Sequence, residues 1–256
     1  MTDDDKAIAI ALPGEWAIRK VLGPTLDEFG EDLKVLYAKG RDNIIAAARR
    51  KMPEKEDGKR ANLRVARDVL WNGAFTDDEV CAEYFGGILA ASRSKDGNND
   101  DAIQFVDVIK SMSSNQLRLH YIIYRGLNDI LITNGRKINV AQGSETQRCE
   151  IWFASVEIEQ VIGLRLDTDP HVLHRLGLLW EYKTDIRMFN RQALPYFFVR
   201  PTSFGILLYA VAHNRLNEWR TFNSKAFGSL GEISMPKYFA ETKDKLAAAV
   251  GLMHKS

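Results

Sequence analysis

The sequence predicts a mostly α fold, in which an N-terminal helical array is followed by a C-terminal winged-helix-like α+β module. Apolar residues recur at spacings of three and four through residues 22–131, as they do on one face of an amphipathic helix. Residues 136–150 are polar and have no apolar period, which is typical of a linker. Residues 173–212 then follow the order helix, strand, polar loop, strand and helix, which is the order of a winged-helix unit.

The length and composition of the chain allow one large domain or two small ones. It has 256 residues, of which 45% are hydrophobic, and this is enough to form proper cores. We place a helical domain at residues 1–135 and a winged-helix-like domain with a C-terminal helix at residues 150–256. The formal net charge is +1, so the global charge predicts neither nucleic-acid binding nor membrane binding.

The sequence predicts a cytoplasmic protein that makes no membrane contact. The apolar run at residues 7–12 is short and follows three aspartates, whereas a secretory signal has a positive start and a longer apolar core. No stretch approaches the ~20 apolar residues of a membrane span. The two cysteines, Cys81 and Cys149, lie in apolar contexts and are predicted to be buried reduced thiols.

Capping signals predict where helices begin in the first half of the chain. Thr76 followed by Glu79 matches a capping box, and so does Ser113 followed by Gln116. The polar turn at residues 96–101 separates two of the helices. The expected helices cover residues 22–52 and 60–70, a segment that begins at Thr76, residues 103–112, and residues 113–131.

The second half of the chain is predicted to contain shorter elements. Thr168 precedes Asp169 and Pro170, a cap followed by proline in the first turn, and Gly177 ends that helix. Thr202 is expected to cap the helix that follows the hairpin. The expected elements are a strand at 151–154, a helix at 155–163, a helix ending at Gly177, strands at 178–183 and 196–200 around a loop at 184–195, and helices at 204–213 and 236–253.

The motifs of common catalytic and cofactor sites are missing from the sequence. There is no glycine-rich phosphate loop and no dinucleotide fingerprint, so we predict no cofactor. Gly86 and Gly87 lie within a predicted helix, and close helix packing is the simplest explanation for them. His171 and His174 have a spacing that can hold a metal, yet no nearby Cys or His completes a set. We therefore assign no metal site and no catalytic residue.

The basic side chains of the C-terminal module are the candidate nucleic-acid-binding residues. Residues 165–200 contain six basic and four acidic residues, a balance of only +2, and phosphate contacts supply much of the affinity of a DNA-binding protein. A structural or protein-docking hairpin is therefore the preferred interpretation, with nucleic-acid binding as the alternative. The candidates are Arg165, His171, His174, Arg175, Lys183, Arg187, Arg191 and Arg200.

Two further surfaces have two interpretations each. Residues 49–67 contain eight basic and three acidic residues, and form either a solvated surface or an anion contact. The aromatic residues of the hairpin form either a stacking surface for bases or the alternating side chains of a half-buried hairpin, which is the simpler explanation. These aromatic residues are Trp180, Tyr182, Tyr196, Phe197 and Phe198.

Two regions of the chain carry a family resemblance. One is LGPTLDEFGEDLKVLYAKGRDNI and the other is TDDEVCAEYFGGILAASRSKDGNNDDAIQFVDVIKSMSSNQLRLHYIIY. With the later segments RLGLL and VRPTSFGILLYA, the chain resembles the bacterial abortive-infection alpha (Abi-alpha) family over residues 22–212. The resemblance implies a mostly helical protein associated with bacterial defence against phage. It brings no catalytic residues with it.

Two functional hypotheses follow. The first is a non-enzymatic anti-phage protein of the abortive-infection type that acts by binding a protein partner. The second is a winged-helix regulator that binds nucleic acid, and it rests on residues 173–212 and 49–67. A homo-oligomer and an enzyme site assembled from distant polar residues stay open.

Overall fold

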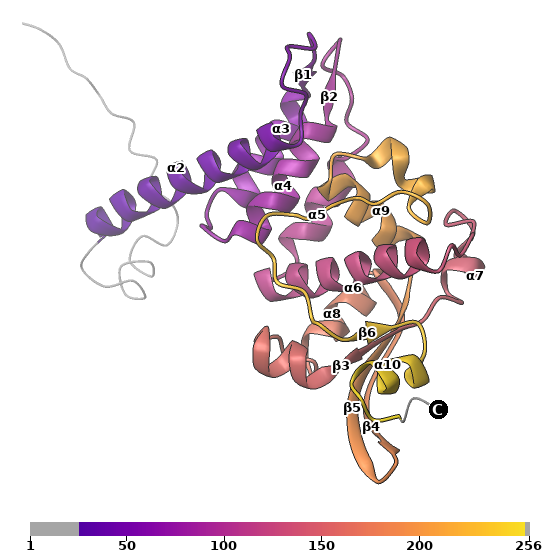
Figure 1. Ribbon diagram of the computed structural model, residues 1–256. Coiled ribbons are helices and arrows are strands. Elements are labelled where there is room, and N and C mark those ends of the chain that lie inside the picture. Colours follow the sequence, from indigo (N-terminus) through magenta and orange to yellow (C-terminus); the bar gives the residue numbers. More distant parts are fainter. Residues whose placement is uncertain (1–25, 254–256) are drawn as a thin grey trace, which may run out of the picture.

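The computed structural model describes residues 26–253, with side chains from residue 32 onward. Helices predominate, and the strands form one two-stranded and one four-stranded sheet, both antiparallel. The protein is therefore a mixed α and β fold in which the larger sheet lies at one end of a group of helices (Figure 1). None of the described helices is both long enough and apolar enough to cross a membrane.

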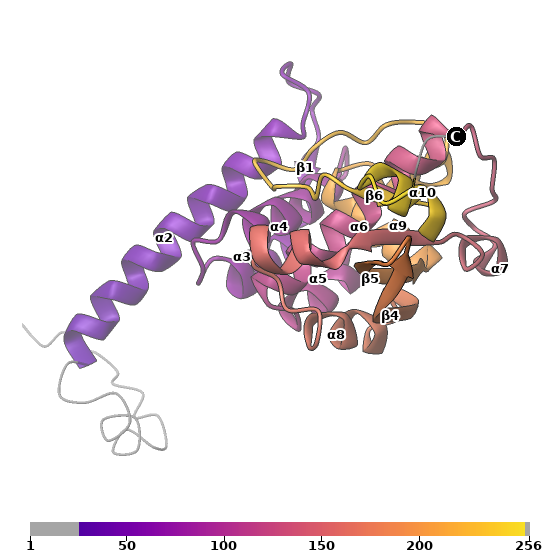
Figure 2. The same ribbon diagram turned by 60° about the horizontal axis from the view of Figure 1, so that its bottom comes forward.

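The first helix, α2 (Leu26–Arg50), is the predicted long helix, and its first half projects from the rest of the protein (Figures 1 and 2). Its predicted start at residue 22 lies outside the described residues. In its second half, Ile44, Ala47 and Ala48 are buried and the helix packs against α4 (Glu79–Ala91). Burial of one face against α4 is what the apolar spacing predicted.

Two glycines let α4 pack between two other helices at short range. A Cβ atom on Gly86 would lie 2.7 Å from the Cβ of Ala47 in α2. A Cβ atom on Gly87 would lie 2.3 Å from the carbonyl oxygen of Ala212 in α9 (Ser203–Ala212). Both separations are far below van der Waals contact, so larger side chains would force the helices apart. The predicted role of these glycines in close helix packing is confirmed.

Asp78 begins α4, and the predicted cap at Thr76 is wrong by two residues. The Asp78 side chain accepts a hydrogen bond from the amide of Cys81 at 3.1 Å. The Thr76 hydroxyl instead accepts from the amide of Asp78 at 3.1 Å and shapes the turn before the helix. A carboxylate at this position accepts a hydrogen bond from a free helix amide and is also attracted by the positive end of the helix dipole.

The helix predicted at residues 60–70 is α3 (Leu63–Gly73), which begins later because its first residues pair as a strand. β1 (Arg60–Ala61) pairs with β2 (Arg93–Ser94), and Asn62 then caps α3 by accepting from the amides of Arg64 and Val65. Sequence spacing cannot reveal this start, because the partner strand lies more than thirty residues away.

The predicted capping box at Ser113 is confirmed. The Ser113 hydroxyl accepts from the amide of Gln116, and the Gln116 side chain accepts from the amide of Ser113. This box begins α6 (Ser114–Thr133), which runs through the middle of the protein and follows α5 (Ile103–Lys110). Most α6 side chains are buried, including His120 and Asn128.

Shorter elements follow the linker region, as predicted. The helix expected at 155–163 is a single π-helical turn, η1. The helix expected after Thr168 and the strand expected at 151–154 are both present, but the predicted cap is wrong, since the Thr168 side chain makes no capping hydrogen bond. The elements are α7 (Gly143–Thr146), β3 (Ile151–Ala154), η1 (Glu157–Val161), α8 (Asp169–Arg175), β4 (Leu179–Phe189), β5 (Gln192–Pro201), η2 (Leu216–Thr221), β6 (Phe239–Ala240) and α10 (Lys243–Ala249).

The β4–β5 hairpin is longer than predicted, because the expected loop at 184–195 is itself paired strand. Thr184 pairs with Phe197, and the pairing continues to Phe189 and Gln192. Only Asn190 and Arg191 form the turn, both with positive φ, as a tight type I′ hairpin turn requires. Charged and polar residues are frequent in this segment, which is why it was predicted to be a loop.

The C-terminal tail also differs from the prediction of a single helix at 236–253. Phe239 and Ala240 form β6, which pairs with Phe153 and Trp152 of β3. Helix α10 begins only after Thr242, which caps it: the Thr242 hydroxyl accepts from the amide of Lys245 at 3.2 Å. Pairing with a distant strand therefore replaces the first part of the expected helix.

One hydrophobic core runs through most of the protein. It includes side chains of α4, α6, β3, β5 and α9, so that residues from both predicted domains belong to it. A second, smaller cluster lies between α10 and the sheet, where Leu246 and Ala247 pack near Tyr196 and Phe198. The division into two domains stays a prediction.

Candidate functional site

The candidate site is built around helix α8 and the β4–β5 hairpin, which follow one another in the chain. The four-stranded sheet has the order β4, β5, β3 and β6, so β5 lies between its hairpin partner β4 and the earlier strand β3. Helix α8 packs against α6 and against β4. The far end of the β4–β5 hairpin extends beyond the helices (Figure 1). This leaves α8 and one face of the hairpin together at the surface.

Tyr182 connects α8 to the hairpin. Its hydroxyl oxygen lies 2.5 Å from Nδ1 of His171, and its ring makes an edge contact with the ring of His174 at 5.7 Å. At the start of the helix, the Asp169 carboxylate accepts from the backbone amide of Arg165 at 3.0 Å. These contacts fix the position of α8, and Tyr182 brings two of the predicted site residues, His171 and His174, together.

Two of the predicted cations are neutralised by neighbouring carboxylates. Arg200 forms ion pairs with Glu150 at 2.7 Å and with Glu181 at 2.9 Å, and these bonds raise its pKa. Lys183 forms an ion pair with Asp185 at 2.6 Å, which lowers the pKa of Asp185. Neither cation offers an uncompensated charge to a phosphate.

The other predicted cations are exposed but lie in different places. Arg165 precedes α8, Arg175 ends α8, Arg187 lies on β4, and Arg191 is in the hairpin turn. His174 is exposed on α8. The predicted residues therefore border one surface without forming a continuous basic patch.

Exposed apolar side chains give this region its most unusual feature. Trp180, Ile186 and Met188 on β4 are 54%, 61% and 60% exposed. Ile186 and Met188 lie on the same face as Tyr182, because alternate strand residues share a face. A hollow of about 680 Å³ beside Trp180 is lined by His174, Trp180 and Thr202 among others. We call Trp180, Ile186, Met188 and His174 the wing surface.

The aromatic residues of the hairpin do not form an exposed stacking surface. Tyr196, Phe197 and Phe198 of β5 are all buried. The ring of Trp152 lies 4.9 Å from Tyr196 and 4.7 Å from Phe198, on the sheet face that α10 covers. Alternation within a half-buried hairpin, the simpler of the two interpretations, explains these residues.

The basic segment at residues 49–67 borders a separate cavity of about 230 Å³ between α2, α4 and the small sheet. Arg93 donates to the Asp57 carboxylate at 2.5 Å, and Arg60 donates to the carbonyl oxygen of Asp96 at 3.0 Å. The cavity lining contains no acidic residue, and its floor is apolar. Its basic lining residues are Arg49, Lys59, Arg60 and Arg93.

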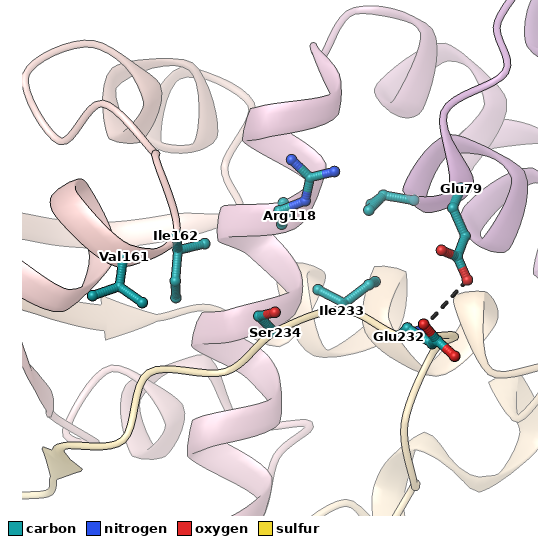
Figure 3. Close-up of a pocket in the computed structure, with 8 residues that line it drawn as sticks. Glu79, Arg118, Val161, Ile162, Glu232, Ile233 and Ser234 are labelled. Carbon is teal, nitrogen blue, oxygen red and sulfur yellow. Dashed lines mark hydrogen bonds between the residues drawn. The ribbon is translucent and has the colours of Figure 1, made fainter.

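A third cavity, of about 250 Å³, lies between α4, α6, η1 and residues 232–234 (Figure 3). Arg118 lines it and lies within 3.5 Å of the carboxylate of Asp78. Glu79 accepts from the backbone amide of Glu232 at 3.4 Å. Since these polar groups already connect the surrounding elements, we interpret this cavity as a junction between them.

Two buried histidines belong to the core. The Nδ1 atom of His120 lies 2.6 Å from the hydroxyl oxygen of Tyr84, and its Nε2 lies 3.2 Å from the carbonyl oxygen of Gly205. Burial lowers the pKa of His120 to about 3, and burial lowers the pKa of His213 to about 3. Both rings are therefore neutral near pH 7. The sequence allows His120 to be either a core or an interface residue, and the structure places it in the core.

Among the side chains that the structure describes, no group of three or more His, Cys, Asp or Glu is placed to hold a metal. His171 and His174 both turn towards Tyr182. Cys81 and Cys149 are buried free thiols, as predicted, and burial raises the pKa of each.

No family model, no curated protein and no solved structure matches the chain.

The apolar part of the wing surface was not predicted from the sequence, because Ile186 and Met188 lie in the segment that was expected to be a loop. The signal was present. Tyr182, Thr184, Ile186 and Met188 alternate with charged residues at the period of two that marks a strand.

Proposed function

We propose that this protein is a non-enzymatic anti-phage protein of the abortive-infection type, and that it acts by binding a protein partner through a winged-helix-like module. The module is the one predicted at residues 150–256, and it contains β3, α8, β4, β5 and α9. Two observations support it: the chain order of these elements, and the position of β5 between β3 and β4. The resemblance to the Abi-alpha family supplies the biological setting.

The wing surface is the observation that carries partner binding. Exposed apolar side chains on a protruding strand are more typical of a protein interface than of a nucleic-acid interface. Aromatic residues such as Trp180 often supply much of the binding free energy of such interfaces. The neutralised charges of Lys183 and Arg200 also favour a protein partner, since phosphate binding depends on free cations.

A plaque assay on bacteria that express the full chain tests this proposal. Trp180→Ala should abolish protection against phage and should remove the partner from pull-downs of infected cells. Trp71→Ala is the matched control, because Trp71 is 70% exposed on α3, away from the wing surface. Equal protection by both variants would contradict the proposal, and so would degradation of nucleotides or nucleic acid by the isolated protein.

A second candidate function, nucleic-acid binding, has its own supporting observation. Four basic residues and no acidic residue line the cavity at the start of the small sheet, and Arg49 and Lys59 are exposed there. Arg49→Glu or Lys59→Glu should weaken binding in a gel-shift assay at low salt, and each lost phosphate contact should reduce the salt slope by about 1. Lys110→Glu on α5 is the control. Lack of binding to any DNA or RNA at low salt would exclude this function.

A further inference from the structure

The strand β4 has an unpaired edge that is ready to bind another strand. It is the outer strand of the four-stranded sheet, and β5 is its only strand partner in the part of the chain that the structure describes. Among the described residues, no backbone hydrogen bond joins β4 to an element other than β5. An open edge of this length is a template for further strand pairing unless its side chains prevent it.

The hairpin turn determines which β4 residues have free backbone groups. Phe189 and Gln192 flank the two-residue turn, and in such hairpins the flanking residues exchange backbone hydrogen bonds. The odd-numbered residues back to Glu181 therefore bond to β5, and the even-numbered residues direct their amides and carbonyls outward. The Ile186 amide confirms this pattern, because it donates to the Asp185 side chain at 2.8 Å and not to β5.

The sequence of this edge is complementary to itself in one antiparallel register. When Thr184 lies opposite Thr184 of a second copy, Lys183 lies opposite Asp185, and Glu181 lies opposite Arg187. On the other face, Tyr182 lies opposite Ile186. Every charged residue from Glu181 to Arg187 thus meets an opposite charge, and the exposed Ile186 meets an aromatic ring.

The same register is the one that joins free backbone groups. It pairs even-numbered residues with even-numbered residues, which gives about six new backbone hydrogen bonds between residues 182 and 186 of the two copies. The bulge between Leu179 and Glu181 ends the regular pairing of β4 with β5 at the start of β4.

Other registers are less favourable. A shift of the centre to Asp185 places Asp185 opposite itself and Lys183 opposite Arg187, and a shift to Lys183 places Glu181 opposite Asp185. Both put like charges together and pair inward-facing backbone groups. A shift of the centre to Ile186 keeps the hydrogen bonds but leaves Lys183 without an acidic partner.

We propose that two copies of this chain form a dimer by antiparallel pairing of their β4 strands, centred on Thr184. This inference rests on the proposed role of the hairpin in protein binding. It identifies a second copy of the chain as one protein that the hairpin binds. The two sheets become one continuous sheet. The Lys183–Asp185 ion pair within each chain is exchanged for the same pair between chains, and the amide of Ile186 exchanges its side-chain contact for a carbonyl of the second copy.

Cysteine cross-linking of the full-length protein tests the register. In this dimer the two Thr184 Cα atoms lie about 5.5 Å apart, within reach of a disulfide. Thr184→Cys should give a cross-linked species of twice the 29.0 kDa chain mass under mild oxidation. Gln192→Cys, exposed on β5, is the control and should stay uncross-linked. The native cysteines are buried and do not interfere. Equal cross-linking of both variants, or of neither, would overturn the register.

Exchange of charged residues tests whether the opposite charges of the two β4 strands hold the dimer together in solution. Sedimentation should show a dimer for the wild-type chain. Lys183→Asp should weaken it about 30-fold, because two symmetry-related attractive pairs become repulsive. The double variant with Asp185→Lys as well should restore the wild-type dimer. Arg191→Asp changes the charge equally in the turn, outside the paired region, and should have little effect. A monomer at every concentration would overturn the proposal.

The outcomes separate this inference from the proposed function. If the wild-type chain is monomeric but Trp180→Ala still abolishes phage protection, the dimer is wrong and the partner-binding function stands. If the chain dimerises through Thr184 but neither Lys183→Asp nor Trp180→Ala reduces protection, the dimer stands and the function of the wing surface is wrong.

Discussion

Replacement of Gly87 by alanine should destabilise the protein, whereas the same replacement at Gly126 should not. Both glycines are buried within helices. The Cβ atom of alanine at position 87 would lie 2.3 Å from the carbonyl oxygen of Ala212, and it could be accommodated only if α4 and α9 moved apart. At position 126, the nearest atoms belong to Phe153 and Phe239 at 3.4 Å, which is ordinary van der Waals contact.

The expected magnitudes follow from these two distances. Alanine gains about 1 kcal/mol over glycine within a helix at either position. At Gly87 the clash is with backbone, which cannot rotate away, so we take the upper end of the overpacking cost, about 3 kcal/mol. The free energy of unfolding should therefore fall by about 2 kcal/mol for Gly87→Ala and rise by up to about 1 kcal/mol for Gly126→Ala.

Urea titration of the free energy of unfolding, followed by circular dichroism, measures both variants. Thermal melts should show Tm lowered by roughly 4–8 °C for Gly87→Ala and unchanged or raised by roughly 2–4 °C for Gly126→Ala. The reasoning fails if Gly87→Ala is as stable as the wild-type protein, or if Gly126→Ala loses as much stability as Gly87→Ala.

Three other predictions concern buried polar groups and a helix cap. The unfolding free energy should fall by about 2 kcal/mol per histidine from about pH 7 to about pH 5, because His120 and His213 stay neutral when folded but gain protons when unfolded. His213→Gln should halve this fall in unfolding free energy, as measured by urea titrations at each pH. A wild-type unfolding free energy that does not change with pH would refute the prediction. Asn128→Asp should cost about 3 kcal/mol in thermal melts, since a carboxylate cannot donate to the carbonyl oxygens of Phe222 and Lys225, and a neutral effect would contradict the buried bonds. Ser113→Ala should cost about 1 kcal/mol by the loss of its cap, and an unchanged urea midpoint would argue against the capping box.

The parts of the candidate site that could be predicted were those with local signals. The helix that ends at Gly177, the paired strands around Tyr182 and Phe198, and the cap at Thr202 all depend on residues close in sequence. The predicted cations were found at the surface, but the ion pair of Arg200 with Glu150 could not be foreseen. Glu150 lies fifty residues from Arg200, and only the fold brings the two together.

The sequence alone determined the amphipathic helices, the Ser113 capping box and the positions of the tight-packing glycines, because each depends on spacing along one element. Tertiary structure decided where strands replaced expected helix, as at β1 and β6, because such a strand is stabilised by a partner whose distance in sequence no local pattern records. It also decided that β4 is an edge strand. The complementary residues of β4 were visible in the sequence, but only the strand order left their backbone groups free to pair.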